Sequence, residues 1–153
     1  MIQMVLSRIV MRENNDQVVI FLKEKEGVRT LPIIIGRNEA LEIRRKVLHV
    51  ATPRPLTHDL VRNVLKELDA HLDHILIDTL KDATFYAKLF VRRNGEMKRV
   101  DARSSDAIAL AAAEGVPIYV NDEVLEEVCR ADQASREKEQ QGSGDEEEGF
   151  GLF

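Results

Sequence analysis

The chain has 153 residues, of which 44% are hydrophobic and 32% are charged, a composition typical of a globular domain with one buried core. No run approaches the roughly 20 apolar residues that a membrane span requires, and the N-terminus lacks the basic and apolar regions of a signal peptide. A single cysteine, Cys129, excludes an internal disulfide and a Cys-x-x-Cys metal site. We therefore expect a cytoplasmic protein that does not enter a membrane.

The net charge of −5 resides in the C-terminal segment 132–153, which has seven acidic and two basic residues. Residues 1–131 carry 20 acidic and 20 basic residues, unlike the strongly basic body of a tight duplex binder. The segment ends in QQGSGDEEEGFGLF, and such a polar, acidic composition is typical of disorder. We therefore expect one folded domain over residues 1–131 and an acidic, disordered tail over 132–153.

The first half of the chain predicts three strands followed by two helices. Two β-branched, apolar runs, 2–12 and 17–23, are separated by ENND, which is the pattern of a hairpin. A third strand is expected over 29–35. Apolar residues at helical spacing then predict a helix over 37–50. Two prolines in ATPRP end this helix, and a second helix is expected over 57–69.

The second half predicts a similar series. Strands are expected over 74–80, 84–91 and 97–102, and the last two are joined by the Asn-Gly of RNGE, a strong hairpin signal. A helix over 104–115 begins at a serine and ends at a glycine, VPIYVND follows, and a last helix begins at residue 122.

Short segments of the two halves also align with one another. RNEALEI (37–43) matches SSDAIAL (104–110), and RPLTHDLVRNVL (54–65) matches VPIYVNDEVLEEV (116–128) when two residues are inserted. The sequence therefore predicts a single α+β domain built by duplication of a three-strand, two-helix unit. Strands from both halves would share a mixed or antiparallel sheet with a barrel-like core.

The stretch RPLTHDL places a histidine beside an aspartate. Thr57 is a good N-cap, and Asp59 in the first turn is favoured by the free N–H groups of the helix. Successive helical residues project about 100° apart, so His58 and Asp59 do not face one another. The stretch therefore predicts a helix start, with His58 as the residue available for acid–base chemistry.

The stretch DARSSDA (101–107) has two interpretations. In the first, Ser104 or Ser105 caps the helix and Asp106 stabilises its first turn. In the second, Arg103 beside the helix N-terminus forms an anion site that accepts a phosphate.

Carboxylates also gather near predicted strand ends. Asp78 and Asp82 flank Lys81 around a turn, where aspartate is common for structural reasons. Hairpin pairing could also bring Asp82 toward Asp101 and Asp106. Clustered aspartates are the usual ligands of Mg²⁺ or Mn²⁺, although no regular ligand spacing is present.

Three motifs in order, RPLTHDL, LKDATFYAKL and DARSSDAIALA with the following GVPIYV, resemble the bifunctional nuclease family over about residues 5 to 128. The resemblance implies an α+β domain, an oligomer that is often a dimer, and nuclease activity on DNA and RNA. The third motif departs from the family form, because Ala102 replaces a serine and Ser104 replaces a proline.

Two functions follow for the same residues. As a metal-assisted nuclease, the chain would hold Mg²⁺ or Mn²⁺ on Asp82, Asp101 and Asp106, with His58 as general acid or base. Its nucleic-acid substrate would be bound by Lys81, Arg103 and Ser105. As a non-catalytic, homo-oligomeric binding or assembly domain, the chain would use these residues only to cap helices and fix turns.

Overall fold

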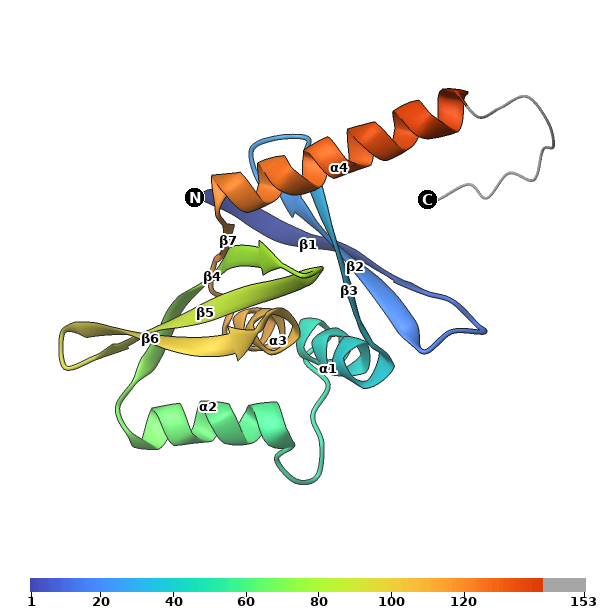
Figure 1. Cartoon of the computed structure of the whole chain (residues 1–153). Coiled ribbons are helices and arrows are strands. Elements are labelled where there is room, and N and C mark those ends of the chain that lie inside the picture. The colour runs from blue at the N-terminus through green and yellow to red at the C-terminus, as the bar shows by residue number, and fades with distance from the viewer. Residues whose placement is uncertain (142–153) are drawn as a thin grey trace.

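The computed structural model describes residues 1–141. Within them the chain forms seven strands and four helices (Figure 1). In chain order these are β1 (Ile2–Met11), β2 (Gln17–Glu24), β3 (Thr30–Gly36), α1 (Arg37–Val47), α2 (Thr57–Glu67), β4 (His71–Lys81), β5 (Thr84–Arg93), β6 (Glu96–Arg103), α3 (Ser104–Glu114), β7 (Ile118–Val120) and α4 (Asp122–Gln141). The predicted α+β class and the order of the elements are confirmed.

All seven strands belong to one sheet with the order β3-β2-β1-β7-β4-β5-β6. The short strand β7 joins the two halves, because it pairs antiparallel with β1 and parallel with β4. The sheet is therefore mixed. Its ends, β3 and β6, do not pair with one another, so the sheet is open and the predicted barrel-like core is not confirmed. The internal duplication stays a prediction.

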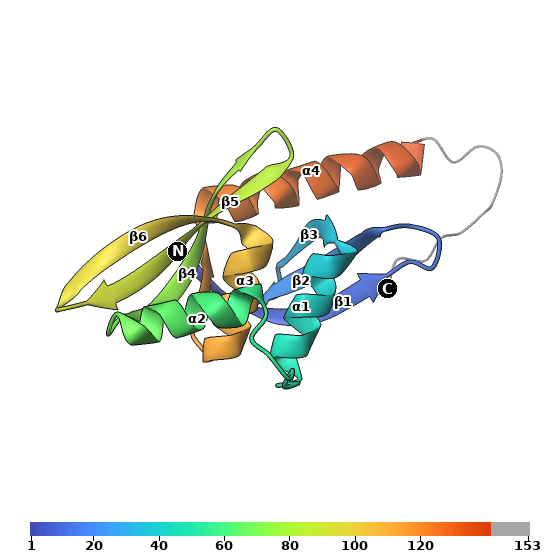
Figure 2. The same cartoon turned by 90° about the horizontal axis from the view of Figure 1, so that it is seen from below.

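Burial alternates along β2 and β3, so one face of this part of the sheet contributes to the core. In β2, Val18, Ile20 and Leu22 are buried, and β3 shows the same alternation. Helix α3 is buried along most of its length and packs against α1, β4 and β5. Figures 1 and 2 show α1 and α3 side by side against the sheet, α2 outside α3, and α4 on the opposite side.

Two turns have the backbone geometry that the sequence predicts. Asn94 and Gly95, which join β5 to β6, have φ angles of 51° and 76°, as a two-residue hairpin turn requires. Gly115 ends α3 with a φ angle of 67° in the left-handed region. Both turns rely on residues that tolerate positive φ.

The helix starts differ from the prediction by one residue. The N-cap of α2 is Leu56 rather than Thr57, and the carboxylate of Asp59 accepts a hydrogen bond of 2.9 Å from the Leu56 N–H. The N-cap of α3 is Arg103, which makes no side-chain capping bond. Ser104 and Ser105 lie inside the first turn and are buried. The carboxylate at the third position, not a hydroxyl, therefore stabilises the start of α2.

Helix α4 continues to Gln141, ten residues beyond the expected domain boundary after residue 131. It thus enters the segment for which we expected disorder. The rest of the predicted acidic tail, 142–153, lies outside the described residues. No helix within residues 1–141 has both the length and the hydrophobicity needed to cross a membrane.

Candidate functional site

His58, the second residue of α2, faces the first turn of α3 and not its neighbour Asp59. Its Nε2 lies 2.8 Å from Oδ1 of Asp106, and its side chain is 17% exposed. Asp59 instead forms an ion pair with Lys46 on α1. The prediction that the adjacent His58 and Asp59 form no dyad is therefore confirmed, and the partner of the histidine comes from a distant helix.

Arg103 holds Asp106 from the other side. Its Nε lies 2.8 Å from Oδ2 and its Nη2 3.1 Å from Oδ1 of Asp106, while Nη1 lies 3.4 Å from Glu39 of α1. Burial works to raise the pKa of Asp106, but the hydrogen bonds from Arg103 and His58 outweigh it and hold this pKa below its usual value. The same hydrogen bond from Arg103 to Asp106 raises the pKa of the guanidinium. Asp106 is therefore ionised at neutral pH.

Two buried charged residues of α1 complete the surroundings of His58. Oε1 of Glu42 lies 3.6 Å from Nδ1 of His58 and 3.4 Å from Nζ of Lys46, but it accepts no hydrogen bond from any residue of 1–141. The other oxygen of Glu42 pairs with Arg45. The hydrogen bond from Lys46 lowers the pKa of Asp59. Through these contacts α1 is tied to the first turn of α2.

Sequence reasoning missed Glu42 and Lys46 as site residues. The sequence contained one signal for them. Glu42 and Lys46 are four residues apart, and they lie on the side of α1 that also contains the buried Ala40 and Ile43. A charged residue in such a stripe needs a partner, since burying an unpaired charge is costly. For Lys46 that partner is Asp59, in the first turn of α2.

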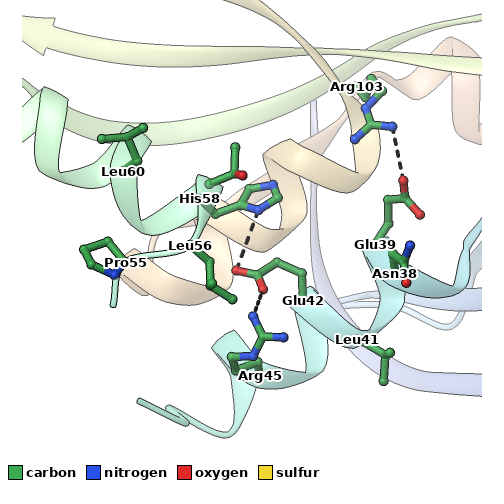
Figure 3. Close-up of a pocket in the computed structure, with 11 residues that line it drawn as sticks. Asn38, Glu39, Leu41, Glu42, Arg45, Pro55, Leu56, His58, Leu60 and Arg103 are labelled. Atoms are coloured by element: carbon green, nitrogen blue, oxygen red, sulfur yellow. Dashed lines mark hydrogen bonds and ion pairs between the residues drawn. The ribbon is translucent and has the colours of Figure 1, made fainter. Parts of the chain in front are cut away.

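These side chains surround an open cavity of about 640 Å³ between α1 and the start of α2 (Figure 3). One wall is charged and includes Glu42, Arg45 and His58, whereas Leu56 and Leu60 form an apolar rim. A second cavity of about 400 Å³ lies beside β3. Glu39 and Arg103 line both cavities, so their ion pair stands between the two.

The structure brings together only some of the residues expected at the site. His58, Arg103 and Asp106 meet directly, and Ser105 lines the second cavity with Thr84 and Phe85. Lys81 ends β4 and Asp82 lies in the turn that follows. Asp101 is 76% exposed on β6 and pairs with Lys88 at 2.6 Å.

The expected metal ligands are therefore dispersed. Asp82, Asp101 and Asp106 occupy a turn, a strand and a helix, and Asp101 and Asp106 are engaged by cationic side chains. Within residues 1–141 no group of three or more His, Cys, Asp or Glu side chains is arranged to hold a metal ion. As placed here, these carboxylates do not fit Mg²⁺ or Mn²⁺, which need several oxygen ligands around one point.

The pairing with Asp106 settles which nitrogen of His58 is free. An ionised carboxylate only accepts hydrogen bonds, so Nε2 of His58 carries the proton that is donated to Asp106. In the neutral ring Nδ1 is then an acceptor that faces the cavity and Glu42. Nδ1 is therefore the ring nitrogen directed toward the cavity, with Oε1 of Glu42 3.6 Å away.

The fold and this site define an α+β domain in which helices beside an open sheet assemble a histidine–carboxylate site. All three motifs of the resemblance contribute, because His58 and Arg103 line the first cavity, and Phe85, Arg103 and Ser105 line the second. The chain belongs to the bifunctional nuclease domain family, which matches residues 20–132.

Two relatives come from Mycobacterium tuberculosis, strains CDC 1551 / Oshkosh and ATCC 25618 / H37Rv. Each is 44% identical to this chain over 117 residues, which is 76% of this chain and 70% of the relative. Both are described as uncharacterized proteins. They support the family membership and assign no reaction.

Proposed function

We propose that the chain is a nuclease that hydrolyses phosphodiester bonds of RNA and DNA, with His58 as its general base. The observation that carries the proposal is the 2.8 Å contact between Nε2 of His58 and Asp106. It orients the ring with Nε2 toward Asp106 and Nδ1 toward the cavity; in Ser-His-Asp hydrolases an aspartate likewise orients the imidazole, although there it holds Nδ1. Membership of the bifunctional nuclease domain family supports the reaction class.

In the proposed reaction water is the nucleophile, because DNA offers no 2′-hydroxyl. A water molecule gives a proton to Nδ1 of His58 as its oxygen attacks phosphorus, and the bond from phosphorus to the leaving sugar oxygen breaks. The imidazolium then returns the proton to that leaving oxygen. Asp106 orients the ring throughout and does not itself transfer a proton.

Arg103 is the candidate for neutralising the phosphate. Its three hydrogen bonds to Asp106 and Glu39 leave two of its five N–H donors for a phosphoryl oxygen. The side chain is 65% exposed at the border of the two cavities. A substrate held there reaches the cavity that contains His58. Lys81 and Ser105 remain proposed substrate contacts.

The assay uses single-stranded RNA and DNA with added Mg²⁺, with Mn²⁺ or with EDTA. We expect cleavage by the native chain and a loss of at least about 100-fold in His58→Gln, the lower range for a general base. His71→Gln, which alters an exposed histidine at the start of β4, is the matched control. Equal cleavage by the native chain and His58→Gln would overturn the assignment. The EDTA arm tests the metal requirement predicted from the sequence; because Asp82, Asp101 and Asp106 are dispersed, we expect cleavage to persist in EDTA.

A second candidate function is a non-catalytic, homo-oligomeric binding or assembly domain. One observation favours it: α2 buries none of its residues, although it contains several large apolar side chains. In this case the ion pairs of His58, Arg103 and Asp106 serve to attach α2. Absence of cleavage in every arm of the assay would favour this function over the nuclease.

A further inference from the structure

The second cavity, beside β3, is lined by side chains of two kinds. Its volume of about 400 Å³ falls within the roughly 300–1,000 Å³ typical of small-molecule sites. Apolar side chains come from β3 and the start of β5, among them Pro32, Ile34 and Phe85. Polar ones come from the end of β6 and the first turn of α3. An apolar lining with a few polar groups is the usual composition of a ligand site.

Two buried serines line this cavity without a hydrogen-bond partner. Ser104 and Ser105 are only 8% and 6% exposed. Neither hydroxyl forms a hydrogen bond with any residue of 1–141, whereas Ser135 on α4 donates its hydroxyl to the Ala131 carbonyl at 2.9 Å. A buried hydroxyl without a partner is costly. A polar ligand in the cavity would therefore stabilise both serines.

The start of α3 adds backbone donors to the two hydroxyls. The first N–H groups of a helix have no acceptor within the helix, and the N-cap of α3, Arg103, makes no side-chain capping bond. Asp106 in the same turn is bonded instead to Arg103 and His58. The start of α2 differs, because Asp59 accepts a hydrogen bond from the Leu56 N–H. The uncapped start of α3 therefore suits an anion with several oxygens, such as a phosphate.

The charges at this cavity also permit an anion. Glu39 is the acidic residue among the side chains that line it, and its carboxylate lies 3.4 Å from Nη1 of Arg103 (Figure 3). The carboxylate is therefore already paired with a guanidinium. Arg103 itself lines the cavity and is 65% exposed. A phosphate at the start of α3 would thus lie beside a cationic side chain that forms charge-assisted hydrogen bonds.

Phe85 supplies an aromatic surface in the same cavity. It is partly buried against the core and lines the cavity together with Ile34, which is 64% exposed. Bases of single-stranded nucleic acids stack on aromatic side chains whatever their sequence, because every base has a π-face. The cavity therefore offers contacts for both parts of a nucleotide, the phosphate and the base.

We propose that the second cavity binds the nucleotide next to the bond that is cleaved, with its phosphate at the start of α3 and its base against Phe85. The proposal rests on the proposed nuclease and adds a subsite to it. A strand that passes Arg103, at the border of the cavities, reaches His58 in the first cavity and Phe85 in the second. Ser105 and Phe85 bind the strand and take no part in breaking the bond.

Adenosine 5′-monophosphate tests the subsite without cleavage, because it contains no phosphodiester bond. Calorimetry on the full-length chain is expected to show tighter binding of this nucleotide than of adenosine or inorganic phosphate. Ser105→Ala should weaken nucleotide binding about 10-fold, as expected for the loss of a hydrogen bond to a charged group. Alanine favours a helix more than serine does, so the fold is kept. Ser7→Ala, at an exposed serine of β1, is the matched control. Equal nucleotide binding by Ser105→Ala and the native chain would overturn the proposal.

Phe85→Leu tests the contact with the base. It is expected to weaken binding of adenosine 5′-monophosphate at least about 5-fold and to leave binding of inorganic phosphate within about two-fold, because a leucine offers no ring for stacking. Phe90→Leu alters another phenylalanine of β5, one that stacks on His74, and is the matched control. Circular dichroism checks the fold of both variants. Phosphate that binds as tightly as the nucleotide would contradict the base contact and overturn the proposal.

The nuclease assay separates failure of the subsite from failure of the nuclease. In Ser105→Ala the KM for RNA is expected to rise about 10-fold while kcat stays within about two-fold, as for a residue that binds ground state and transition state alike. Cleavage of RNA by a chain that does not bind the nucleotide would overturn the subsite. Nucleotide binding that depends on Ser105 and Phe85, in a chain that cleaves no RNA, would support the nucleotide site and contradict the nuclease.

Discussion

Nε2 of His58 and Oδ1 of Asp106 lie 2.8 Å apart although 48 residues separate them in the chain. The contact exists because α2 lies across the first turn of α3, where Asp106 is held by Arg103. Both residues come from the starts of helices, where free N–H groups favour a carboxylate. The site therefore lies where the N-termini of α2 and α3 approach each other, and charged residues of α1 contact both.

Asp106→Asn is expected to reduce the proposed nuclease activity by at least about 100-fold while the fold is retained. An amide can donate to Nε2, so the ring is no longer held with its proton on that nitrogen and Nδ1 is no longer the free base. Cleavage of labelled RNA, with circular dichroism of the same sample, measures both effects. Retention of full activity would show that Asp106 does not orient His58.

Much of the fold was predictable, because it depends on local patterns. The buried alternation of Val18, Ile20 and Leu22 and the Asn94-Gly95 turn are signals contained within a few residues. The site was only partly predictable, since it depends on how α2 lies against α1 and α3. His58 and Asp106 were each identified, but nothing local to either indicates that they meet.

The prediction of a metal site also depended on how separate elements lie against one another. Asp101 and Asp106 are close in sequence, yet one belongs to an exposed strand and the other to a helix. Asp101→Asn is therefore expected to leave cleavage of RNA within about two-fold of the native rate, in contrast to Asp106→Asn, because its contact is an exposed ion pair with Lys88. A loss of cleavage rate as large as that of Asp106→Asn would show that Asp101 contributes to the reaction.

Lys46→Met is expected to lower the free energy of unfolding by up to about 3 kcal/mol. Lys46 is buried and contacts both Glu42 and Asp59, so its removal leaves the buried Glu42 with only Arg45 and, 3.6 Å away, Nδ1 of His58 among the described residues. Urea denaturation followed by circular dichroism measures the loss. In Lys98→Met, the control, the ion pair with Glu96 is exposed and the change should stay below about 1 kcal/mol. Equal losses of unfolding free energy in the two variants would show that burial of the Lys46 ion pairs does not increase their contribution to stability.

Acid is expected to destabilise the protein through Asp59 and Asp106. The pKa of each is depressed in the folded state, Asp59 chiefly by Lys46, and Asp106 by Arg103 and His58 against the opposing effect of burial. Their contribution is therefore complete above the unfolded pKa of about 3.9 and is lost as pH falls through the lower folded values. Thermal unfolding between pH 7 and pH 3 measures it. Asp59→Asn should lower Tm at pH 7 and flatten the acid limb, whereas the exposed Asp16→Asn should do neither.

Gly95→Ala is expected to destabilise the protein by about 1 kcal/mol through backbone strain alone. Gly95 has a φ angle of 76°, and a Cβ added there would meet no atom within 4 Å, so no steric clash contributes. Its neighbour Asn94 also has positive φ, and the pair forms the turn between β5 and β6. Denaturant unfolding measures the change. Since Arg103 is the last residue of β6, the nuclease assay on the same variant separates strain in the turn from damage to the site. Activity should remain near the native level, and a loss comparable to that of Asp106→Asn would show that the hairpin positions Arg103.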